Sequence, residues 1–472
     1  MTTDDPADRA NIPTWRPDRP PPVVSAVPEA TGTTQLLGYN RAHTPRPALV
    51  VTAANATEVA AAVRYAAEAR RSVAMHCTGH GLVDEVLGSV LIDTHQMKSL
   101  TVDPHRRTAR VAAGVVWSEV IEAAAPHGLA PLNGSFPGVG VMGFTLGGGL
   151  GPMARAYGFA ADHVREVELV TADGRLRRVN DKREPELFWG LRGGKGNFGV
   201  ATEMEFSLVP VAALHGGGIY YRAESAVEAL HTYRTWTLDL PEEITTSIAL
   251  LRMPPTPEIP EPLRGRFVVH LRVAYLGDRH GADSLLAPMR KVGGILVDDV
   301  RDMPYTEIAS IHNDPPDPSA FWERSAMLSA PSEGDIDALL RIAGPEAELP
   351  LAMVELRHLG GAVRRPPTIP NAVGNRDAEF VLLALGYLTD RNTGAGFRTD
   401  ELTEAGERVI GALAGCDTGG TLLNFQGTAT APEQVRCAFD PDSYTRLRRL
   451  KQIHDPGHVF GFGHVIPAGI QE

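Results

Sequence analysis

The chain has 472 residues, of which 43% are hydrophobic, and a net charge of −12. Its length suits two or three packed lobes, and its acidic balance argues against a nucleic acid as partner, because phosphate binding needs clustered Lys and Arg. The sequence has no run of 18 or more apolar residues, so we expect no membrane span and no membrane partner. Three scattered cysteines do not make a disulfide framework and fit a reducing, cytoplasmic compartment.

The N-terminal part of the chain combines short strands with helices. Residues 1–37 are polar, acidic and then Pro-rich, and we expect them to form an N-terminal arm. Strands are then predicted, in chain order, at 48–54, 72–75, 90–93 and 110–113. Asn55 begins a helix whose apolar residues recur at helical spacing, and a second helix is predicted at 116–125. This order is typical of an α+β fold with mixed strands, not of a strict βαβ repeat.

Two clusters of glycine follow. The first lies within 131–151, and the second, at 193–199, ends a helix predicted at 184–191. Between them a strand at 164–171 leads into a hairpin turn at 172–175, and a strand at 200–208 closes this half of the chain. Clustered glycines let backbone N–H groups approach a pyrophosphate closely, although a cluster alone can also serve only to make tight bends.

The first cluster also contains a formal dinucleotide fingerprint, Gly138-x-Gly140-x-x-Gly143. That motif should follow a strand and open a helix. Here the motif follows the segment 133–137, which ends in proline, and precedes the run Gly147-Gly148-Gly149, where a helix does not readily begin. A long glycine loop therefore explains the cluster better than a nicotinamide-binding Rossmann unit does.

The pattern of predicted strands and helices changes after Pro210. Residues 213–430 alternate strands, at 266–274, 352–358 and 380–384, with helices at 225–238 and 400–413. This pattern indicates an antiparallel sheet with helices on one face. A last helix, predicted at 443–454, ends at Asp455-Pro456-Gly457.

Several segments in a fixed order resemble the vanillyl-alcohol oxidase/p-cresol methylhydroxylase superfamily and its berberine-bridge-enzyme-like branch. They are 46–59, the turn Thr78-Gly79-His80-Gly81, the glycine segments 137–151 and 192–202, and the C-terminal stretch from Tyr444 to Phe460. The resemblance implies an α+β fold with a two-lobed FAD-binding domain of the p-cresol methylhydroxylase type and an antiparallel-sheet substrate domain. It implies an FAD-binding domain at 38–211, a substrate-binding domain at 212–430, and a C-terminal segment, 431–472, that returns to the FAD domain.

The resemblance also implies a covalently held cofactor. Family members usually carry a histidine at the position of His80, whose ring nitrogen bonds the 8α carbon of FAD, and a neutral imidazole is a suitable nucleophile. His76, four residues earlier, is the rival for this role. Many relatives add a second bond from a cysteine at the position that is Phe136 here, so we expect a single covalent link, to His80.

Carried over residue by residue, the family's FAD contacts fall on the turn and on the two glycine segments. They are His76, Cys77, Thr78, Gly79, His80, Gly81, Val139, Gly140, Val141, Gly143, Thr145, Gly147, Gly148, Gly151, Gly199 and Val200. In this branch a valine at the position of Val139 leaves space for oxygen above the flavin, which favours an oxidase over a dehydrogenase.

The resemblance therefore predicts an FAD-dependent oxidase. Such an enzyme transfers hydride from a hydroxyl- or amine-bearing small molecule to flavin N5, and molecular oxygen is reduced to hydrogen peroxide. An alternative is an oxidative cyclisation or rearrangement of a specialised metabolite, as some relatives of secondary metabolism perform, and a third possibility is a non-catalytic flavin-binding protein. No metal site is predicted.

The residues that move protons are harder to assign. Relatives often use a tyrosine in a Tyr-x-Asn-Tyr stretch, but the matching residues, 422–425, are Leu-Leu-Asn-Phe. On the predicted strand 352–358, Glu355 and Arg357 share one face and His358 lies on the other; buried charges there suggest a role, although a solvated Glu–Arg pair is an equal explanation. Tyr444 and His464 are the other catalytic candidates, and Tyr444 is more often a packing residue in the family.

Overall fold

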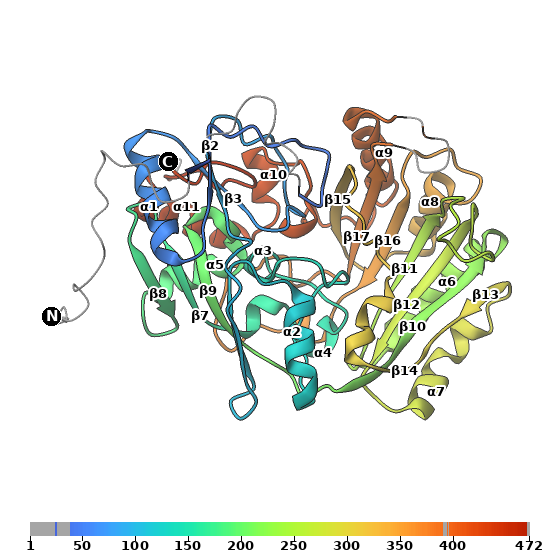
Figure 1. Cartoon of the computed structure of the whole chain (residues 1–472). Coiled ribbons are helices and arrows are strands. Elements are labelled where there is room, and N and C mark those ends of the chain that lie inside the picture. Colours follow the sequence, from blue (N-terminus) through green and yellow to red (C-terminus); the bar gives the residue numbers. More distant parts are fainter. Residues whose placement is uncertain (1–23, 26–37, 390–393, 395, 470–472) are drawn as a thin grey trace.

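The computed structural model describes residues 24–25, 38–389, 394 and 396–469, which form two lobes (Figure 1). The first lobe contains the N-terminal half of the chain together with its C-terminal helices, and the second contains the middle of the chain. Most of the expected N-terminal arm lies outside the described residues. Within it, β1 (Val24–Ser25) pairs antiparallel with β2 (Leu49–Thr52), so this part of the arm joins a sheet.

Two sheets build the first lobe. In the four-stranded sheet, with the order β1-β2-β4-β3, the strands β2, β4 (Val90–Asp93) and β3 (Val73–His76) are parallel. The five-stranded sheet is antiparallel and has the order β5-β6-β9-β7-β8. Its strands are β5 (Leu100–Asp103), β6 (Thr108–Ala112), β7 (Val164–Val170), β8 (Leu176–Asn180) and β9 (Val200–Ser207).

The first helix of this lobe begins at the residue where the sequence predicts a cap, Asn55. The Asn55 side chain accepts a hydrogen bond from the Glu58 backbone (3.0 Å), and Glu58 in turn bonds the Ala54 N–H (2.8 Å), which starts α1 (Ala56–Glu68). The other helices of the N-terminal half are α2 (Trp117–Ala124), α3 (Val141–Leu146), α4 (Ala154–Tyr157) and α5 (Pro185–Gly194).

The first glycine cluster differs from the expected long loop. The short helix α3 begins at Val141, directly after Gly140, and ends at Gly147, before the remaining glycines. The fingerprint thus opens a helix of six residues but follows no named strand of the described chain, since Gly140 makes only an isolated bridge with Val116. The second cluster also lies partly inside α5, although Arg192 and Gly193 leave helical geometry there.

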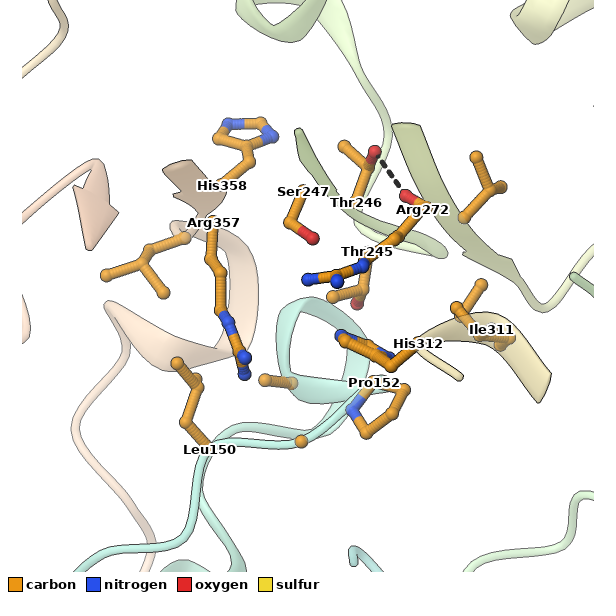
Figure 2. Close-up of a pocket in the computed structure, with 15 residues that line it drawn as sticks. Leu150, Pro152, Thr245, Thr246, Ser247, Arg272, Ile311, His312, Arg357 and His358 are labelled. Carbon is orange, nitrogen blue, oxygen red and sulfur yellow. Dashed lines mark hydrogen bonds between the residues drawn. The ribbon is translucent and has the colours of Figure 1, made fainter. Parts of the chain in front are cut away.

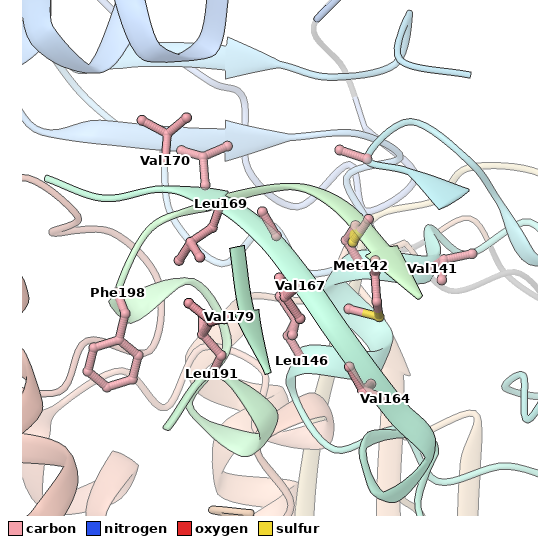
Figure 3. Close-up of a cluster of buried hydrophobic side chains, with 14 of the residues drawn as sticks. Val141, Met142, Leu146, Val164, Val167, Leu169, Val170, Val179, Leu191 and Phe198 are labelled. Atoms are coloured by element: carbon pink, nitrogen blue, oxygen red, sulfur yellow. The ribbon is translucent and has the colours of Figure 1, made fainter. Parts of the chain in front are cut away.

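A large apolar core holds the first lobe together. Figure 3 shows its centre, where Leu169, Val179, Leu191 and Phe198 meet the side chains of α3. These side chains are almost fully buried, and burying a side chain of this size contributes about 1.5–3 kcal/mol each. The core thereby fixes the glycine segments that follow α3 and α5 relative to each other.

The second lobe is one antiparallel sheet of eight strands. Its order is β13-β10-β12-β11-β16-β17-β15, with β14 also pairing with β10. The strands are β10 (Ala213–Arg222), β11 (Ile244–Arg252), β12 (Phe267–Tyr275), β13 (Ile295–Asp298), β14 (Arg301–Pro304), β15 (Phe321–Leu328), β16 (Met353–His358) and β17 (Phe380–Tyr387).

Four helices cover one face of this sheet, as the sequence predicts (Figure 1). They are α6 (Ala226–Trp236), α7 (Arg279–Arg290), α8 (Glu333–Ala343) and α9 (Thr399–Ala412). Alternate residues of the strands, such as Val269, Leu271 and Val273 of β12, pack with these helices in a second core. The opposite face of the sheet is turned toward the first lobe.

The C-terminal segment returns to the first lobe. Its helices, α10 (Pro432–Arg436) and α11 (Pro441–His454), place Val435, Leu447 and Leu450 in the core of that lobe. Within α11, Lys451 is fully buried and donates to Asp455 (2.6 Å) and to the carbonyls of Asn197 and Phe460 (2.9 Å each). This network ties the end of the chain to the second glycine segment.

Candidate active site

A cavity of about 430 Å³ lies between the two lobes. Its floor comes from residues 73–84, 134–136, 195–197 and 199–201 of the first lobe. Its roof comes from cavity-facing side chains of the eight-stranded sheet, which are Phe321, Glu323, Met353, Arg357, Leu383 and Leu385. The turn that contains His80 and both glycine segments therefore meet the second lobe around one space.

His80 lines the floor with one ring nitrogen free. Its Nδ1 forms a hydrogen bond with the Thr78 hydroxyl (2.9 Å), and its ring stacks on Tyr39 with centroids 4.0 Å apart. Its Nε2 is buried without a hydrogen-bond partner among the described residues. Burial lowers the pKa of His80 to about 4. The ring is therefore neutral at ordinary pH, and the Nε2 atom is not engaged in a hydrogen bond with the described residues.

His76 occupies a different position on the same wall. It ends β3, its Nδ1 lies 3.7 Å from an oxygen of the buried Asp93, and its Nε2 lies under the turn, close to Gly79. Gly79 has a φ of +69°, and a Cβ there would come within 2.3 Å of the Gly38 backbone. Glycine is thus required to fold the turn over His76, which is more deeply buried than His80.

Eleven of the residues expected to bind FAD line the cavity. They are His76, Cys77, Thr78, Gly79, His80, Gly81, Val139, Gly140, Gly143, Gly199 and Val200. A Cβ added at Gly143 would meet no atom within 4 Å in the described part of the chain, so the backbone of α3 is open to the cavity there. An open backbone surface with a neutral, unpaired imidazole beside it fits a large cofactor such as FAD.

The other five residues expected to contact FAD lie behind the cavity wall. Val141, Thr145, Gly147, Gly148 and Gly151 do not line the cavity. Val141 and Thr145 are buried, because they lie on the inner side of α3. A Cβ at Gly147 would lie 2.0 Å from the Asn424 side chain, and one at Gly151 would lie 2.0 Å from the Asn133 carbonyl. These glycines allow chain segments to pack closely instead of contacting a ligand.

Glu355 and Arg357 share a face of β16, but only Arg357 reaches the cavity. Glu355 is fully buried and accepts hydrogen bonds from Arg272 (2.5 Å), Arg357 (2.8 Å) and Ser247 (2.6 Å). Although burial opposes ionisation, the two guanidinium groups hold the pKa of Glu355 well below its usual range. The Glu–Arg pair is thus buried, not solvated, and its carboxylate is a weak base.

His358 lies on the other face and lines a smaller cavity of about 30 Å³ (Figure 2). Its Nε2 lies 3.1 Å from a guanidinium nitrogen of Arg155, and burial lowers its pKa to about 3. Figure 2 shows that Arg357, Arg272 and His312 surround the same small space from the opposite side. The expectation that His358 acts together with Glu355 and Arg357 at the main cavity is therefore corrected.

The two C-terminal candidates differ in position. His464 lines the main cavity, its Nε2 bonds the Gly427 carbonyl (2.9 Å), and burial lowers its pKa to about 3. Tyr444 lies in the core of the first lobe, stacks on Phe439 and donates only to the Pro432 carbonyl (3.4 Å). Tyr444 does not line the cavity, and its surroundings are those of a packing residue.

Four charged residues at the cavity are absent from the sequence prediction, namely Asp84, Lys195, Asp314 and Glu323. Glu323 lies on the roof strand β15, and burial raises its pKa to about 7. Lys195 lies on the floor in the second glycine segment, where its backbone has a φ of +56°. A Lys among glycines is the signal that could have identified Lys195, whereas Glu323 is followed directly by Arg324 and Ser325 and gives no such signal.

The stretch 422–425, which lacks the tyrosines of the relatives, still reaches the cavity. Asn424 and Phe425 line the cavity, and Asn424 donates to the Phe144 carbonyl (2.8 Å). The Phe425 ring lies 5.0 Å from the guanidinium carbon of Arg357. Phenylalanine has no hydroxyl, so the base of the site has to come from another element.

No group of three or more His, Cys, Asp or Glu side chains in the described part of the chain is arranged to hold a metal ion. Nor does any helix within the described ranges have the length and apolar character needed to cross a membrane.

Comparison with known proteins places this geometry in context. Residues 47–180 match the family model described as an FAD binding domain. The chain is 29% identical over 433 residues to (R)-6-hydroxynicotine oxidase of Paenarthrobacter nicotinovorans, an alignment that covers 89% of this chain and 90% of the relative.

Solved structures share the fold at lower identity. Xylooligosaccharide oxidase from Myceliophthora thermophila C1, in complex with xylobiose, has a TM-score of 0.80 at 20% identity and covers 95% of this chain and 97% of its own. Berberine bridge enzyme from Eschscholzia californica has a TM-score of 0.80 at 18% identity, with 96% and 98% covered. The expected α+β fold with two lobes is thereby confirmed.

Proposed function

We propose that this chain is an FAD-linked oxidase of a hydroxyl- or amine-bearing small molecule and that it belongs to the vanillyl-alcohol oxidase superfamily. The match of residues 47–180 to an FAD binding domain and the likeness to (R)-6-hydroxynicotine oxidase support the proposal. FAD, when bound, would supply the acceptor for hydride from the substrate, with molecular oxygen as the final oxidant and hydrogen peroxide as its product. The residues of this chain bind the cofactor, orient the substrate and manage protons.

The free nitrogen of His80 carries the proposal that the cofactor is covalently attached. The Thr78 hydroxyl and the Tyr39 ring hold the imidazole in one orientation, and its Nε2 is left without a partner among the described residues at the cavity wall. A neutral imidazole in a fixed orientation is suited to bond the 8α carbon of FAD. Flavin absorbance that remains with the acid-precipitated chain supports this attachment, and absorbance that stays in the supernatant contradicts it.

A single attachment is proposed because the second site is aromatic. Phe136 lines the cavity beside the His80 ring, with centroids 5.6 Å apart. Its side chain cannot form a thioether, and Cys77, which also lines the cavity, lies in the His80 turn and not in the loop that carries the second bond in relatives. We expect Phe136 to pack against the flavin edge.

The substrate would bind between the flavin and the roof. The roof offers apolar side chains from Phe321, Met353, Leu383 and Leu385, together with two charged groups, Glu323 and Arg357. The named relatives oxidise 6-hydroxynicotine or oligosaccharides, so both an amine and a sugar belong in the first panel of substrates. Hydrogen peroxide release with a member of such a panel supports an oxidase, and flavin reduction without peroxide contradicts it.

The apolar roof also favours a second candidate function. An oxidative cyclisation or rearrangement of a specialised metabolite needs a wide apolar surface, and the tyrosine pair that serves as base in relatives is replaced by Leu422 and Phe425. In that case a polycyclic substrate would be converted with one flavin reduction per ring closed, whereas simple alcohols and amines would leave the flavin oxidised.

A further inference from the structure

Glu323 is the roof carboxyl that faces the cavity from an apolar surface. On β15 it pairs with Leu385 of β17, which in turn pairs with Met353 of β16, so these three residues form one row across the sheet. All three line the cavity, as does Phe321, two residues earlier on the same face of β15. The sheet thus presents a single carboxyl group among apolar neighbours.

The Glu323 carboxyl has no fixed partner. It makes no hydrogen bond and no ion pair with any described residue. Glu355, two strands away, is instead held by two arginines. Burial without a partner disfavours the charged form and raises the pKa of Glu323 to about 7, while Lys195 and Arg357 oppose this rise. A base of this strength suits proton transfer near neutral pH, and the arginine-bound Glu355 does not.

Lys195 lies on the floor of the cavity, and its backbone has an unfavourable conformation. Its φ of +56° with a ψ of −140° lies outside the regions that side-chain-bearing residues favour, so the backbone is strained at this position. Its ammonium lies close to Gly81, within 3.5 Å of where a Cβ would be, and makes no ion pair within the described chain. Its charge acts on both Glu323 and His464, although it lies beyond the 4.0 Å of an ion pair from Glu323. An open gap therefore separates the cation from the carboxyl.

We propose that Glu323 is the catalytic base of the cavity and that Lys195 is its positioning cation, a proposal that rests on the FAD-dependent oxidation proposed above. The substrate C–H bond breaks with its hydrogen and both electrons going to FAD. The O–H or N–H bond on the same carbon breaks with its proton going to the Glu323 carboxylate, and a C=O or C=N bond forms. Oxygen then takes the two electrons and two protons, one of them from Glu323, to give hydrogen peroxide.

Other titratable groups at the cavity are less suited to this role. His80 and His464 have pKa values lowered by burial to about 4 and about 3, so they are weak bases. Asp314 also lines the cavity, on the segment after the 3-10 helix Tyr305–Ile311. Arg357 cannot lose its proton at ordinary pH. Asp314 is therefore the matched control, a second carboxyl in the same space.

The test compares Glu323→Gln with Asp314→Asn in the FAD-loaded protein. Anaerobic reduction of the flavin is followed with (R)-6-hydroxynicotine and with xylobiose as probes, across a range of pH. We expect the wild-type rate to rise with pH to a plateau with a midpoint near the pKa of Glu323, and Glu323→Gln to lose that rise and to slow by about 10²–10⁴-fold. Asp314→Asn should keep the wild-type pH midpoint whatever its effect on the rate, and Glu323→Asp should recover part of the rate lost in Glu323→Gln. A pH rise that persists in Glu323→Gln, or one that is lost in Asp314→Asn instead, would overturn the proposal.

If neither probe reduces the flavin, the protonation of Glu323 can still be measured without a substrate. Infrared difference spectra of the FAD-loaded protein between about pH 5.5 and about pH 8.5 should show a protonated carboxyl band that is absent in Glu323→Gln. Lys195→Met should move the midpoint of this band to higher pH, because the cation lowers the pKa of Glu323. A band that persists in Glu323→Gln overturns the assignment, whereas a chain that retains no FAD at all contradicts the proposed function instead.

Discussion

Lys451 offers the strongest test of how the C-terminal segment supports the cavity. Its ammonium is fully buried and donates to the Asp455 carboxylate (2.6 Å) and to the carbonyls of Asn197 and Phe460. Lys451→Met keeps a side chain of similar length but removes the charge and all three donors. Asp455 would keep only the Val459 and Phe460 N–H donors and would remain a buried, uncompensated charge.

Breaking a buried ion pair from one side costs about 3–5 kcal/mol, so we expect Lys451→Met to lose about that much stability. Urea unfolding of the FAD-loaded protein measures it, with the change read from the midpoint at constant slope. Gln452→Met, on the exposed side of α11, is the matched control and should change stability by less than about 0.5 kcal/mol. Lys451→Met combined with Asp455→Leu should recover part of the loss. A loss in Lys451→Met no larger than in the control would refute the reasoning.

Three further outcomes follow from the cavity. Gly143→Ala should fold normally but bind less FAD, because its Cβ would project into the open cavity. Gly147→Ala should instead destabilise the protein, because its Cβ would collide with the Asn424 side chain. Thermal unfolding measures the loss of stability, and the flavin-to-protein absorbance ratio measures the loss of FAD. Val139→Leu should slow reoxidation by oxygen without slowing anaerobic reduction, which stopped-flow absorbance checks. The folded protein raises the pKa of Glu323 from 4.5 to about 7. The carboxyl of Glu323 therefore contributes stability to the folded protein at low pH, and this contribution is lost as pH rises through that window. Wild type should therefore lose stability relative to Glu323→Gln across that window in urea titrations, and parallel curves would argue against the shift.

The local parts of the site were predictable from sequence because they depend on neighbouring residues. The turn that carries His80 needs Gly79 at a positive φ, and this requirement is visible as a short glycine motif. The alternation on β16 correctly separated Glu355 and Arg357 from His358, since side chains on a strand alternate between faces. The helix positions also followed from apolar spacing and from caps such as Asn55.

The remaining parts depend on contacts between distant segments, which spacing does not reveal. Glu323 faces the cavity only because β15 pairs with β17 in a particular register. Glu355 is unavailable because Arg272, on β12, reaches it across β11. Gly147 and Gly151 look like phosphate-binding glycines in the sequence, but Asn424 and Asn133 fill the space beside them.

The intact mass of the denatured chain tests the central claim most directly. The account predicts a wild-type mass increased by that of one FAD, the mass of the bare chain for His80→Ala, and an unchanged wild-type increase for His76→Ala. His80→Ala should still bind FAD without a covalent bond, since the other cavity residues are intact. A wild-type chain with no added mass, or an added mass that His80→Ala retains, would contradict the attachment at His80.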